Sequence, residues 1–407
     1  MDSSYVRKGF GLKREIAEDL ASYHSTVVDR LREQGYTLTI GDLTFRLAKE
    51  FGFCYGVDRA VEYAYESRRK FPDRRLFLVG EIIHNPHVNA RLEAIGVRIL
   101  GYDPNGTFDF SVIQPEDVVL MPAFGVTVQD FARLRGIGCV VVDTTCGSVL
   151  NVWKRVERYA RDGFTSVVHG KHYHEETKAT VSQVTTYEGG RYLILLNMDE
   201  AEAVCRFIER EDNLDELERL FRHRVSDGFD FVRDLRKVGV ANQTTMLANE
   251  SLAIAARIGR SLETRYGKDA LDEHFRSFDT ICSATQERQD AVLDLIAEPL
   301  DVMLVIGGYN SSNTANLARI CATKLRTYHI ADASCIEPAD GSIRHKPVDE
   351  RDERDERDWL NGVRRIGLTA GASTPNNKIG EAVERILETK GLRVDGETAR
   401  RRADGEA

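Results

Sequence analysis

Apolar runs and stretches with helical periodicity alternate along most of this chain. Most of the apolar runs are short stretches bounded by polar turns, which is typical of strands buried on both faces. The predicted strands occupy residues 44–47, 76–79, 118–121, 139–143, 165–168, 192–196, 238–241, 302–306, 326–330 and 366–369. Because helical segments separate them, the pattern predicts an α/β fold with mostly parallel sheets.

The same rhythm falls into three blocks, preceded by a charged amphipathic helix over residues 12–34. We predict a helical N-terminal extension, three α/β domains and a disordered polar tail, at residues 1–43, 44–146, 147–278, 279–390 and 391–407. The second domain carries a charged helical insertion over 199–237, which we expect to form a surface lobe. The run DERDERDERD over 349–358 balances its charges and suggests a solvated loop or a short exposed helix without an assigned function.

Composition narrows the classes of function. The 407 residues are 42% hydrophobic and 30% charged, as in a globular protein, and carry a formal net charge of −9. This acidic balance argues against broad attraction to nucleic acid or to an anionic membrane. We therefore expect a small-molecule or protein partner.

The cysteines indicate a reducing compartment. Seven cysteines, an odd number, are spread along a chain that has neither an apolar leader nor an apolar run of membrane-spanning length. We therefore expect free thiols and a cytoplasmic protein.

Three of the cysteines, Cys54, Cys146 and Cys282, lie in segments that lead into predicted helices. Free backbone N–H groups and the helix dipole lower a thiol's pKa there and favour a metal-binding thiolate. Cys139, Cys205 and Cys321 lie in apolar patterns that suggest core positions. The pattern around Cys335 is ambiguous. Three thiolates suit an iron–sulfur cluster that keeps one iron open, although spacing alone does not distinguish it from a zinc site.

Two turns are predicted to bind anions. Residues 307–313 connect the strand 302–306 to a helix, and residues 369–375 connect the strand 366–369 to another. Their glycines, hydroxyls and amide allow close backbone approach and hydrogen bonding at a helix start, which favours a phosphate. Neither turn is a P-loop, and simple helix capping would also explain both.

Histidines and hydroxyls follow other predicted strands. His84 follows the strand 76–79, residues 169–177 (HGKHYHEET) follow the strand 165–168, and Thr244 follows the strand 238–241. The carboxyl ends of parallel strands are where α/β proteins bind ligands. Such groups could bind anions or relay protons, and His169, His172 and His174 could instead bind zinc.

Taken together, these stretches resemble a known family. The following motifs occur in order between residues 43 and 387: FGFCYGVDRA, EIIHNPHVNARLE, VDTTC, HGKHYHEET, ANQTTML, TICSATQERQDA, IGGYNSSNTANL and TAGASTP. They are similar to those of the 4-hydroxy-3-methylbut-2-enyl diphosphate reductases, the IspH/LytB family. RKGFG, PAFG and the insertion near residue 199 resemble the longer form found in cyanobacteria and plants.

The resemblance implies three α/β domains in a pseudo-threefold trefoil around a central [4Fe-4S] cluster. Cys54, Cys146 and Cys282 would each supply one thiolate, and the open fourth iron would take the allylic hydroxyl of the substrate. The family reaction removes that hydroxyl with two electrons and two protons and gives isopentenyl and dimethylallyl diphosphates.

The resemblance also implies roles for the residues at the strand ends. Glu176 would deliver the proton through a network with Thr244. The diphosphate would be bound by His84, His174, Ser311, Ser312, Asn313 and Ser373. The electron donors of the family are small carriers such as ferredoxin or flavodoxin, and we expect a monomer or a homodimer.

Two positions depart from the family pattern. Phe124 stands where many shorter members have a histidine, so one anion-binding imidazole is missing. Gly147 follows Cys146 where the family usually has proline, so we expect a less rigid turn that still binds the cluster.

Two other functions remain open at this point. A zinc-dependent hydrolase of a phosphorylated metabolite would use His169, His172 and His174. A non-catalytic anion-binding protein would use the cysteines for packing and the glycine-rich turns as helix caps.

Overall fold

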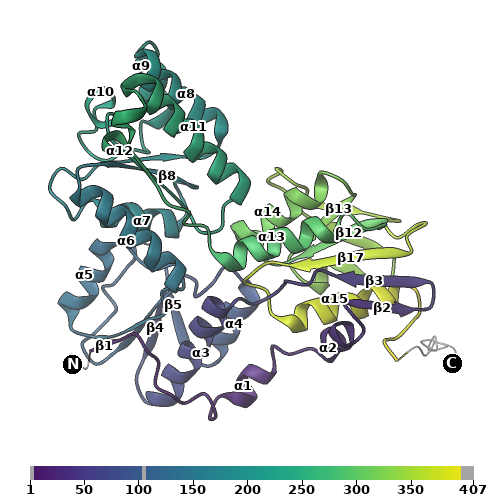
Figure 1. Ribbon diagram of the computed structural model, residues 1–407. Helices are drawn as coiled ribbons and strands as arrows, with labels where there is room; N and C mark the ends of the chain where they lie inside the picture. The colour runs from purple at the N-terminus through teal and green to yellow at the C-terminus, as the bar shows by residue number, and fades with distance from the viewer. Residues whose placement is uncertain (1–3, 103–106, 396–407) are drawn as a thin grey trace, which may run out of the picture. The chain divides into compact units, whose positions relative to one another are not determined.

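The computed structural model describes residues 4–102 and 107–395 (Figure 1). Contacts divide the chain into two compact units. The first contains Met1–Leu12, Arg59–Ile83 and Arg91–Cys282, and the second contains Lys13–Asp58, His84–Ala90 and Ser283–Ala407. The chain passes from one unit to the other several times, so neither unit is a continuous segment.

The first unit contains two sheets in which every strand pair is parallel. The first sheet has the order β1-β7-β6-β4-β5. Its strands are β1 (Tyr5–Val6), β4 (Leu76–Val79), β5 (Val97–Leu100), β6 (Val118–Met121) and β7 (Val140–Asp143). β4 and β6 are buried at every position, as expected for central strands of a parallel sheet. The helices between these strands are α3 (Tyr55–Lys70), α4 (Pro86–Ala94) and α5 (Val128–Ile137), and the first residues of α3 and α4 belong to the second unit.

The second sheet of this unit has the order β11-β10-β8-β9. Its strands are β8 (Thr165–His169), β9 (Tyr192–Leu195), β10 (Val238–Asn242) and β11 (Phe275–Ser277). One face packs against α6 (Gly147–Arg161) and α7 (Glu175–Val184), and the other against α8 (Met198–Arg210), α9 (Leu214–Phe221) and α11 (Ala248–Tyr266) (Figure 1). Short helical turns complete it: α10 (Phe231–Asp234), η1 (Lys268–Ala270) and α12 (Leu271–His274).

The insertion predicted over 199–237 is helical, as expected, and comprises α8, α9 and α10. It is more than a surface lobe, because Phe207, Phe221 and Phe231 are buried and belong to the core over the second sheet. α8 packs along α11 (Figure 1). The apolar residues spaced between its charges therefore determine the packing.

The main sheet of the second unit has the order β13-β12-β17-β3-β2. Its strands are β2 (Thr37–Ile40), β3 (Leu43–Leu47), β12 (Val302–Ile306), β13 (Thr327–Ile330) and β17 (Arg365–Ala370). Only the pair β2–β3 is antiparallel. α2 (Thr26–Glu33) and α15 (Asn376–Thr389) cover one face, and α13 (Ser283–Leu295) and α14 (Ser312–Ala322) cover the other (Figure 1).

This sheet corrects the placement of the strand at residues 44–47. We expect that strand to begin an α/β domain over 44–146, but β3 pairs in parallel with β17, with Phe45 opposite Ile366. Phe45 and Leu47 are buried in the core that α2 and α15 complete. Contacts with residues far away in the sequence therefore decide which strand β3 pairs with. The other domain boundaries remain predictions.

The helix predicted over residues 12–34 is interrupted. It forms α1 (Ala17–Ala21) and α2, and Ser25 begins α2 because its Oγ accepts the N–H of Val28 at 3.3 Å. The extension also contributes β1, which pairs with β7 of the first unit's sheet. The expected helical extension is therefore part strand and part helix.

The charged run at 349–358 is partly a strand, which corrects the expectation of a loop or helix. Arg354–Glu356 forms β16, which pairs with β15 (Ser342–His345), and β15 pairs with β14 (Ile336–Glu337). The turn η2 (Ala333–Cys335) precedes this antiparallel sheet. Strand pairing uses backbone groups, so the composition of the run does not reveal it.

The tail predicted to be disordered from residue 391 is ordered at its start. Leu392 and Val394 pack against the core of the second unit, and Arg30 Nη1 donates to the carbonyl oxygen of Val394 at 2.6 Å. Residues 396–407 lie outside the described residues. Within 4–102 and 107–395, no helix combines the length and the apolar character needed to cross a membrane.

Candidate functional site

Cys146 and Cys282 lie in the first unit, and both are half-buried. Cys146 is the N-cap of α6, with an extended backbone (φ −63°, ψ 143°), and Cys282 directly precedes α13. Ser148, in the first turn of α6, donates its hydroxyl to the sulfur of Cys282 at 3.3 Å. The structure therefore brings two of the three predicted ligand cysteines to one place at helix starts, where thiolates are stabilised.

Cys54 lies in the second unit, directly before α3, and is also half-buried. Its N–H donates to the carbonyl oxygen of Ala372 at 3.2 Å, and its own carbonyl accepts the N–H of Asp58 at 2.9 Å. Gly52 has φ +67°, and a Cβ there would lie 2.9 Å from Asn376 Oδ1. The turn that presents Cys54 therefore requires glycine.

The other four cysteines are buried, which confirms core positions for Cys139, Cys205 and Cys321 and assigns one to Cys335. Burial raises the pKa of the Cys205 thiol to about 11 and that of Cys321 to about 12. These thiols therefore stay protonated and are poor metal ligands. The sulfur donors that remain half-buried are those of the three cysteines at helix starts.

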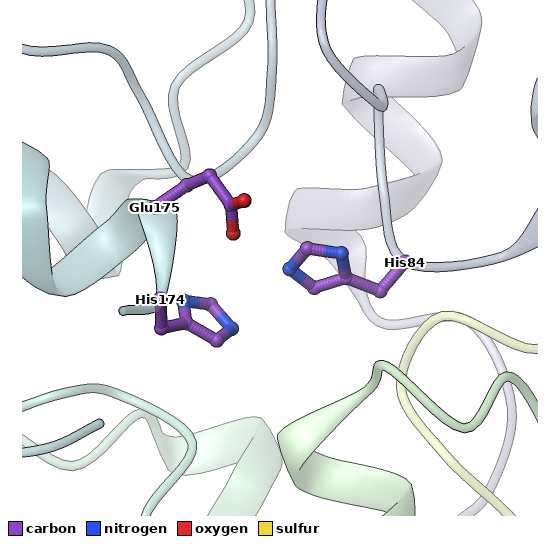
Figure 2. A group of neighbouring side chains, drawn as sticks. All are labelled: His84, His174 and Glu175. Carbon is purple, nitrogen blue, oxygen red and sulfur yellow. The ribbon is translucent and has the colours of Figure 1, made fainter. Parts of the chain in front are cut away.

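Glu176 and Thr244 meet in the first unit. α7 begins at this place, and Figure 2 shows His174 and Glu175 at its start. His174 is the N-cap, and its Nδ1 accepts the N–H of Glu176 at 3.2 Å. The Glu176 side chain is 3% exposed, and its Oε1 accepts the backbone N–H of Thr244 at 2.6 Å. The carbonyl oxygen of Thr244 accepts the N–H of Cys282 at 3.3 Å, so a buried carboxyl is coupled to a candidate ligand cysteine.

His169 is a structural histidine. Its Nε2 lies 3.1 Å from the carbonyl oxygen of Leu196 and its Nδ1 lies 2.8 Å from Ser251 Oγ. Burial lowers its pKa to about 4, so the ring is neutral, with Nε2 donating to the carbonyl and Nδ1 accepting from the hydroxyl. Because both nitrogens are used, the structure does not support a zinc site built on His169, His172 and His174.

The turn predicted to bind an anion after β12 leads into α14. Ser311 is the N-cap, and its Oγ accepts the N–H of Thr314 at 3.3 Å. Ser312 and Asn313 are buried, and Asn313 Oδ1 accepts the N–H of Ala372 at 3.0 Å. Among the described residues, Asn313 Nδ2 has no hydrogen-bond partner, and a buried donor left over in this way fits an anion.

The second predicted turn, after β17, lies against the segment that carries His84. Ser373 Oγ donates to the carbonyl oxygen of His84 at 3.3 Å, and Asn85 Nδ2 donates to the carbonyl oxygen of Ser373 at 2.9 Å. A Cβ on Gly308 would lie 2.7 Å from the same His84 oxygen, so the first turn also approaches this segment. The second unit therefore brings together His84, which precedes α4 (Figure 2), and the two anion turns.

Phe124 occupies the position at which many shorter members of the family that this chain resembles have a histidine. It packs beside His174. The two ring centroids lie 6.2 Å apart with the rings at 72°. Phe124 is buried, and Gly125 after it has φ +79° and leaves no room for a Cβ, which would collide with the Trp153 ring. An apolar ring thus supports the orientation of His174 instead of supplying a second imidazole.

Comparison with known proteins decides the family. Residues 45–387 match the family model described as LytB protein. The chain belongs to the LytB family. A 4-hydroxy-3-methylbut-2-enyl diphosphate reductase of Gloeobacter violaceus is 46% identical over 401 residues, which cover 97% of this chain and 95% of the relative.

Solved structures agree with this LytB assignment. The structure of an (E)-4-hydroxy-3-methyl-but-2-enyl diphosphate reductase, described as the terminal enzyme of the non-mevalonate pathway, is 27% identical with a TM-score of 0.51 and covers 84% of this chain and 99% of its own. The E-1-hydroxy-2-methyl-but-2-enyl-4-diphosphate reductase from Plasmodium falciparum is 20% identical with a TM-score of 0.61, covers 83% of this chain and 86% of its own, and bears on fold alone. The α/β class with mostly parallel sheets is confirmed.

Sequence reasoning missed two residues that shape the cysteine turns of this LytB chain. Arg288 is 4% exposed and donates from Nη2 to the carbonyl oxygens of Gly52 at 2.8 Å and Phe53 at 3.2 Å. Asp143, also buried, accepts the N–H of Thr145 at 2.9 Å, one residue before Cys146. An arginine within a polar helix carries no signal of burial, whereas a carboxylate closing an apolar strand could have drawn attention.

Proposed function

We propose that this LytB chain reduces 4-hydroxy-3-methylbut-2-enyl diphosphate to isopentenyl and dimethylallyl diphosphates, the last step of the methylerythritol phosphate route to isoprenoids. The observation that carries the proposal is the match to the Gloeobacter violaceus reductase over 97% of this chain. In this reaction the allylic C–O bond breaks, two electrons and two protons are taken up, and the hydroxyl leaves as water.

Cys54, Cys146 and Cys282 would hold one [4Fe-4S] cluster that keeps an open iron site. Half-buried thiolates at helix starts are the soft donors that such a cluster takes, and the other cysteines are enclosed in cores. When bound, the cluster supplies electrons and a Lewis-acidic iron for the hydroxyl.

Glu176 delivers a proton to the leaving hydroxyl. Hydroxide leaves poorly, so protonation at the oxygen lowers the barrier to breaking the C–O bond. The Thr244 N–H fixes the orientation of the carboxyl. Burial of both residues excludes bulk water, which would otherwise compete for the proton.

The diphosphate is bound by hydrogen-bond donors at strand ends. In the second unit, Asn313 contributes a buried amide N–H that is free to meet an anion. The start of α14 adds backbone N–H groups and the positive end of the helix dipole. The full set is His84, His174, Ser311, Ser312, Asn313 and Ser373.

The reaction needs an external source of electrons. A small carrier such as ferredoxin or flavodoxin would supply them in the cytoplasm. We place the chain there as a monomer or homodimer.

Oxygen-free purification tests the proposal. We expect a brown protein with iron and acid-labile sulfide that converts 4-hydroxy-3-methylbut-2-enyl diphosphate when a low-potential reductant is added. Cys54→Ser should lose cluster iron and activity, whereas Cys205→Ser, at a fully buried position in the core over the second sheet, should keep both. A colourless, zinc-loaded protein, or iron content that Cys54→Ser leaves unchanged, would contradict it.

A further inference from the structure

Tyr309 lies within the anion turn at 307–313, directly after its two glycines. Its hydroxyl donates to Oε1 of Glu353 at 2.7 Å. Glu353 belongs to the charged run 349–358, which has no role in the reaction proposed above. The contact therefore connects a segment of unassigned function to the turn that carries Ser311 and Asn313.

The surroundings of Tyr309 fix this hydrogen bond. The ring of His329 lies edge-on to that of Tyr309, with centroids 5.0 Å apart, and Lys346 Nζ lies 5.6 Å from the Tyr309 centroid. Burial and the Glu353 carboxylate raise the pKa of Tyr309, so the phenol stays protonated and remains the donor. Arg344 Nε lies 3.3 Å from the same Glu353 oxygen, within ion-pair distance.

A second contact connects the run to the helix that follows the turn. Asp349 Oδ1 accepts from Arg319 Nη2 of α14 at 2.7 Å. Asp349 has φ +64°, a left-handed conformation that is uncommon for a residue other than glycine. Both partners are largely exposed, so this pair contributes less than the Tyr309 hydrogen bond.

The beginning of the turn is held from another strand. His329, on β13, donates from Nε2 to the carbonyl oxygen of Gly307 at 3.0 Å, and burial lowers its pKa to about 4, so it is neutral. Gly307 is thus fixed by the sheet, and Tyr309 is fixed by the run. These two contacts therefore fix the position of the polar residues 310–313 that follow.

We propose that residues 349–356 position the anion turn, with Glu353 as the main positioning residue through Tyr309 and Asp349 as a secondary one through Arg319. The segment touches no substrate. It restricts the turn to the conformation in which Ser311 and Asn313 point their donors at one anion. The effect on diphosphate affinity rests on the proposed function, whereas the effect on the turn itself does not.

The chain offers a matched control. Tyr328, on β13, donates its hydroxyl to Glu356 Oε1 at 2.5 Å, so it makes the same kind of bond to the same charged run. Tyr328 lies in the sheet and not in the turn. Tyr→Phe at either position removes one hydroxyl and keeps the ring, so both variants should fold.

Hydrogen–deuterium exchange on the full chain tests positioning directly. We expect Tyr309→Phe to speed exchange of the backbone N–H groups of residues 310–313 by about tenfold, which corresponds to the loss of one good hydrogen bond. Tyr328→Phe should leave these groups unchanged. Equal exchange of this segment in Tyr309→Phe and wild type would overturn the proposal.

Calorimetric titration with inorganic pyrophosphate tests the consequence for binding. We expect the Kd of Tyr309→Phe to rise about threefold to tenfold and that of Tyr328→Phe to stay within about twofold. In the holoenzyme, KM for the allylic diphosphate should rise by the same factor with kcat unchanged. If wild type binds no pyrophosphate and converts no substrate, the proposed function fails, and the exchange comparison still decides whether the run positions the turn.

Discussion

The backbone N–H of Thr244 donates to Oε1 of Glu176 at 2.6 Å, and the carbonyl oxygen of Thr244 accepts the N–H of Cys282. Ala372 has the same place in the second unit: its carbonyl accepts the N–H of Cys54, and its N–H donates to Asn313 Oδ1. In each unit a single residue of backbone therefore connects a candidate ligand cysteine to a candidate substrate residue. The position of the cysteine and the position of the candidate substrate-binding side chain are therefore coupled, because the same residue is hydrogen-bonded to both.

Glu176→Gln separates the two tasks of the carboxyl. The amide oxygen still accepts the Thr244 N–H, so the turn keeps its geometry, but the side chain has no acidic proton to deliver. We expect kcat to fall by about a hundredfold or more while KM changes by less than about threefold. Steady-state kinetics with the reduced holoenzyme measures both.

Glu175→Gln is the control for this substitution. Glu175 is the neighbouring carboxyl at the start of α7, and its Oε1 accepts the hydroxyl of Tyr102 at 3.3 Å. We expect kcat within about threefold of wild type, because the hydrogen bonds of Glu176 with Thr244 and His174 are kept in this variant. If both variants lose activity equally, the loss reflects charge at the helix start and not proton delivery.

The N-terminal strand β1 should support the turn before Cys146. Tyr5 donates its hydroxyl to Asp143 Oδ2 at 2.6 Å, and Asp143 Oδ1 accepts the N–H of Thr145. Tyr5→Phe should lower the free energy of unfolding by about 1–2 kcal/mol and speed alkylation of Cys146 in the metal-free protein. Urea unfolding and mass spectrometry after timed alkylation measure the two effects.

Ser4→Ala controls for general loosening of the N-terminal segment. Its hydroxyl accepts an exposed hydrogen bond from Arg135 Nη1 at 3.0 Å, and the substitution keeps the backbone bond between the Ser4 carbonyl oxygen and the N–H of Val141. We expect unfolding within about 0.5 kcal/mol of wild type and unchanged alkylation of Cys146. Unaltered alkylation in Tyr5→Phe would show that Asp143 holds the turn without Tyr5.

The local features of this chain could be predicted from its sequence, and the long-range ones could not. Each cysteine at a helix start, and each glycine-rich turn after an apolar strand, has its signal within a few neighbouring residues. The pairing of β3 with β17 joins residues 44–47 to 365–368, and no local pattern specifies it. Hydrophobic strands of similar composition are interchangeable until the core around them is known.

The same limit applies to single polar residues. Arg288 looks like one more charged position on α13, yet its guanidinium is buried on the carbonyl oxygens of the Cys54 turn. Glu353 looks like one more member of a balanced charged run, yet it accepts the Tyr309 hydroxyl. Composition describes the average member of such a segment, and the functional contact belongs to a single residue.

Acidification should destabilise the protein through His169. Burial lowers its folded pKa from 6.5 to about 4, so as pH falls the unfolded chain binds a proton before the folded chain does. The contribution is complete above pH 6.5 and is lost as pH falls from 6.5 to about 4. Between pH 7 and pH 5 we expect a loss of about 2 kcal/mol in the free energy of unfolding from this residue.

Urea unfolding of His169→Gln at the two pH values checks this assignment. The variant starts less stable, because hydrogen bonds to Ser251 and Leu196 change, but its loss between pH 7 and pH 5 should be smaller by about 2 kcal/mol. His223→Gln, at an exposed position, should keep the wild-type pH dependence. A His169→Gln profile parallel to wild type would place the acid sensitivity elsewhere.

Gly147→Pro should tighten the turn that presents Cys146. Gly147 is the first residue of α6, where proline is favoured, and Cys146 before it has ψ 143°, the extended conformation that proline requires. A Cβ at Gly147 meets no atom within 4 Å. The substitution should raise the free energy of unfolding by about 0.4–1 kcal/mol, because proline restricts the unfolded chain. In the holoenzyme it should also slow the loss of iron in air.

The sign of this effect depends on backbone conformation, which a pair of alanine variants makes visible. Gly147→Ala should also stabilise, because Gly147 does not adopt positive φ. Gly138→Ala, at the left-handed C-cap of α5 with φ +83°, should cost about 1 kcal/mol. Urea unfolding compares the three variants. The proposal that glycine loosens the turn before α6 would be wrong if Gly147→Pro destabilised the chain or left the loss of iron in air unchanged. The presence of glycine at this position would then need another explanation.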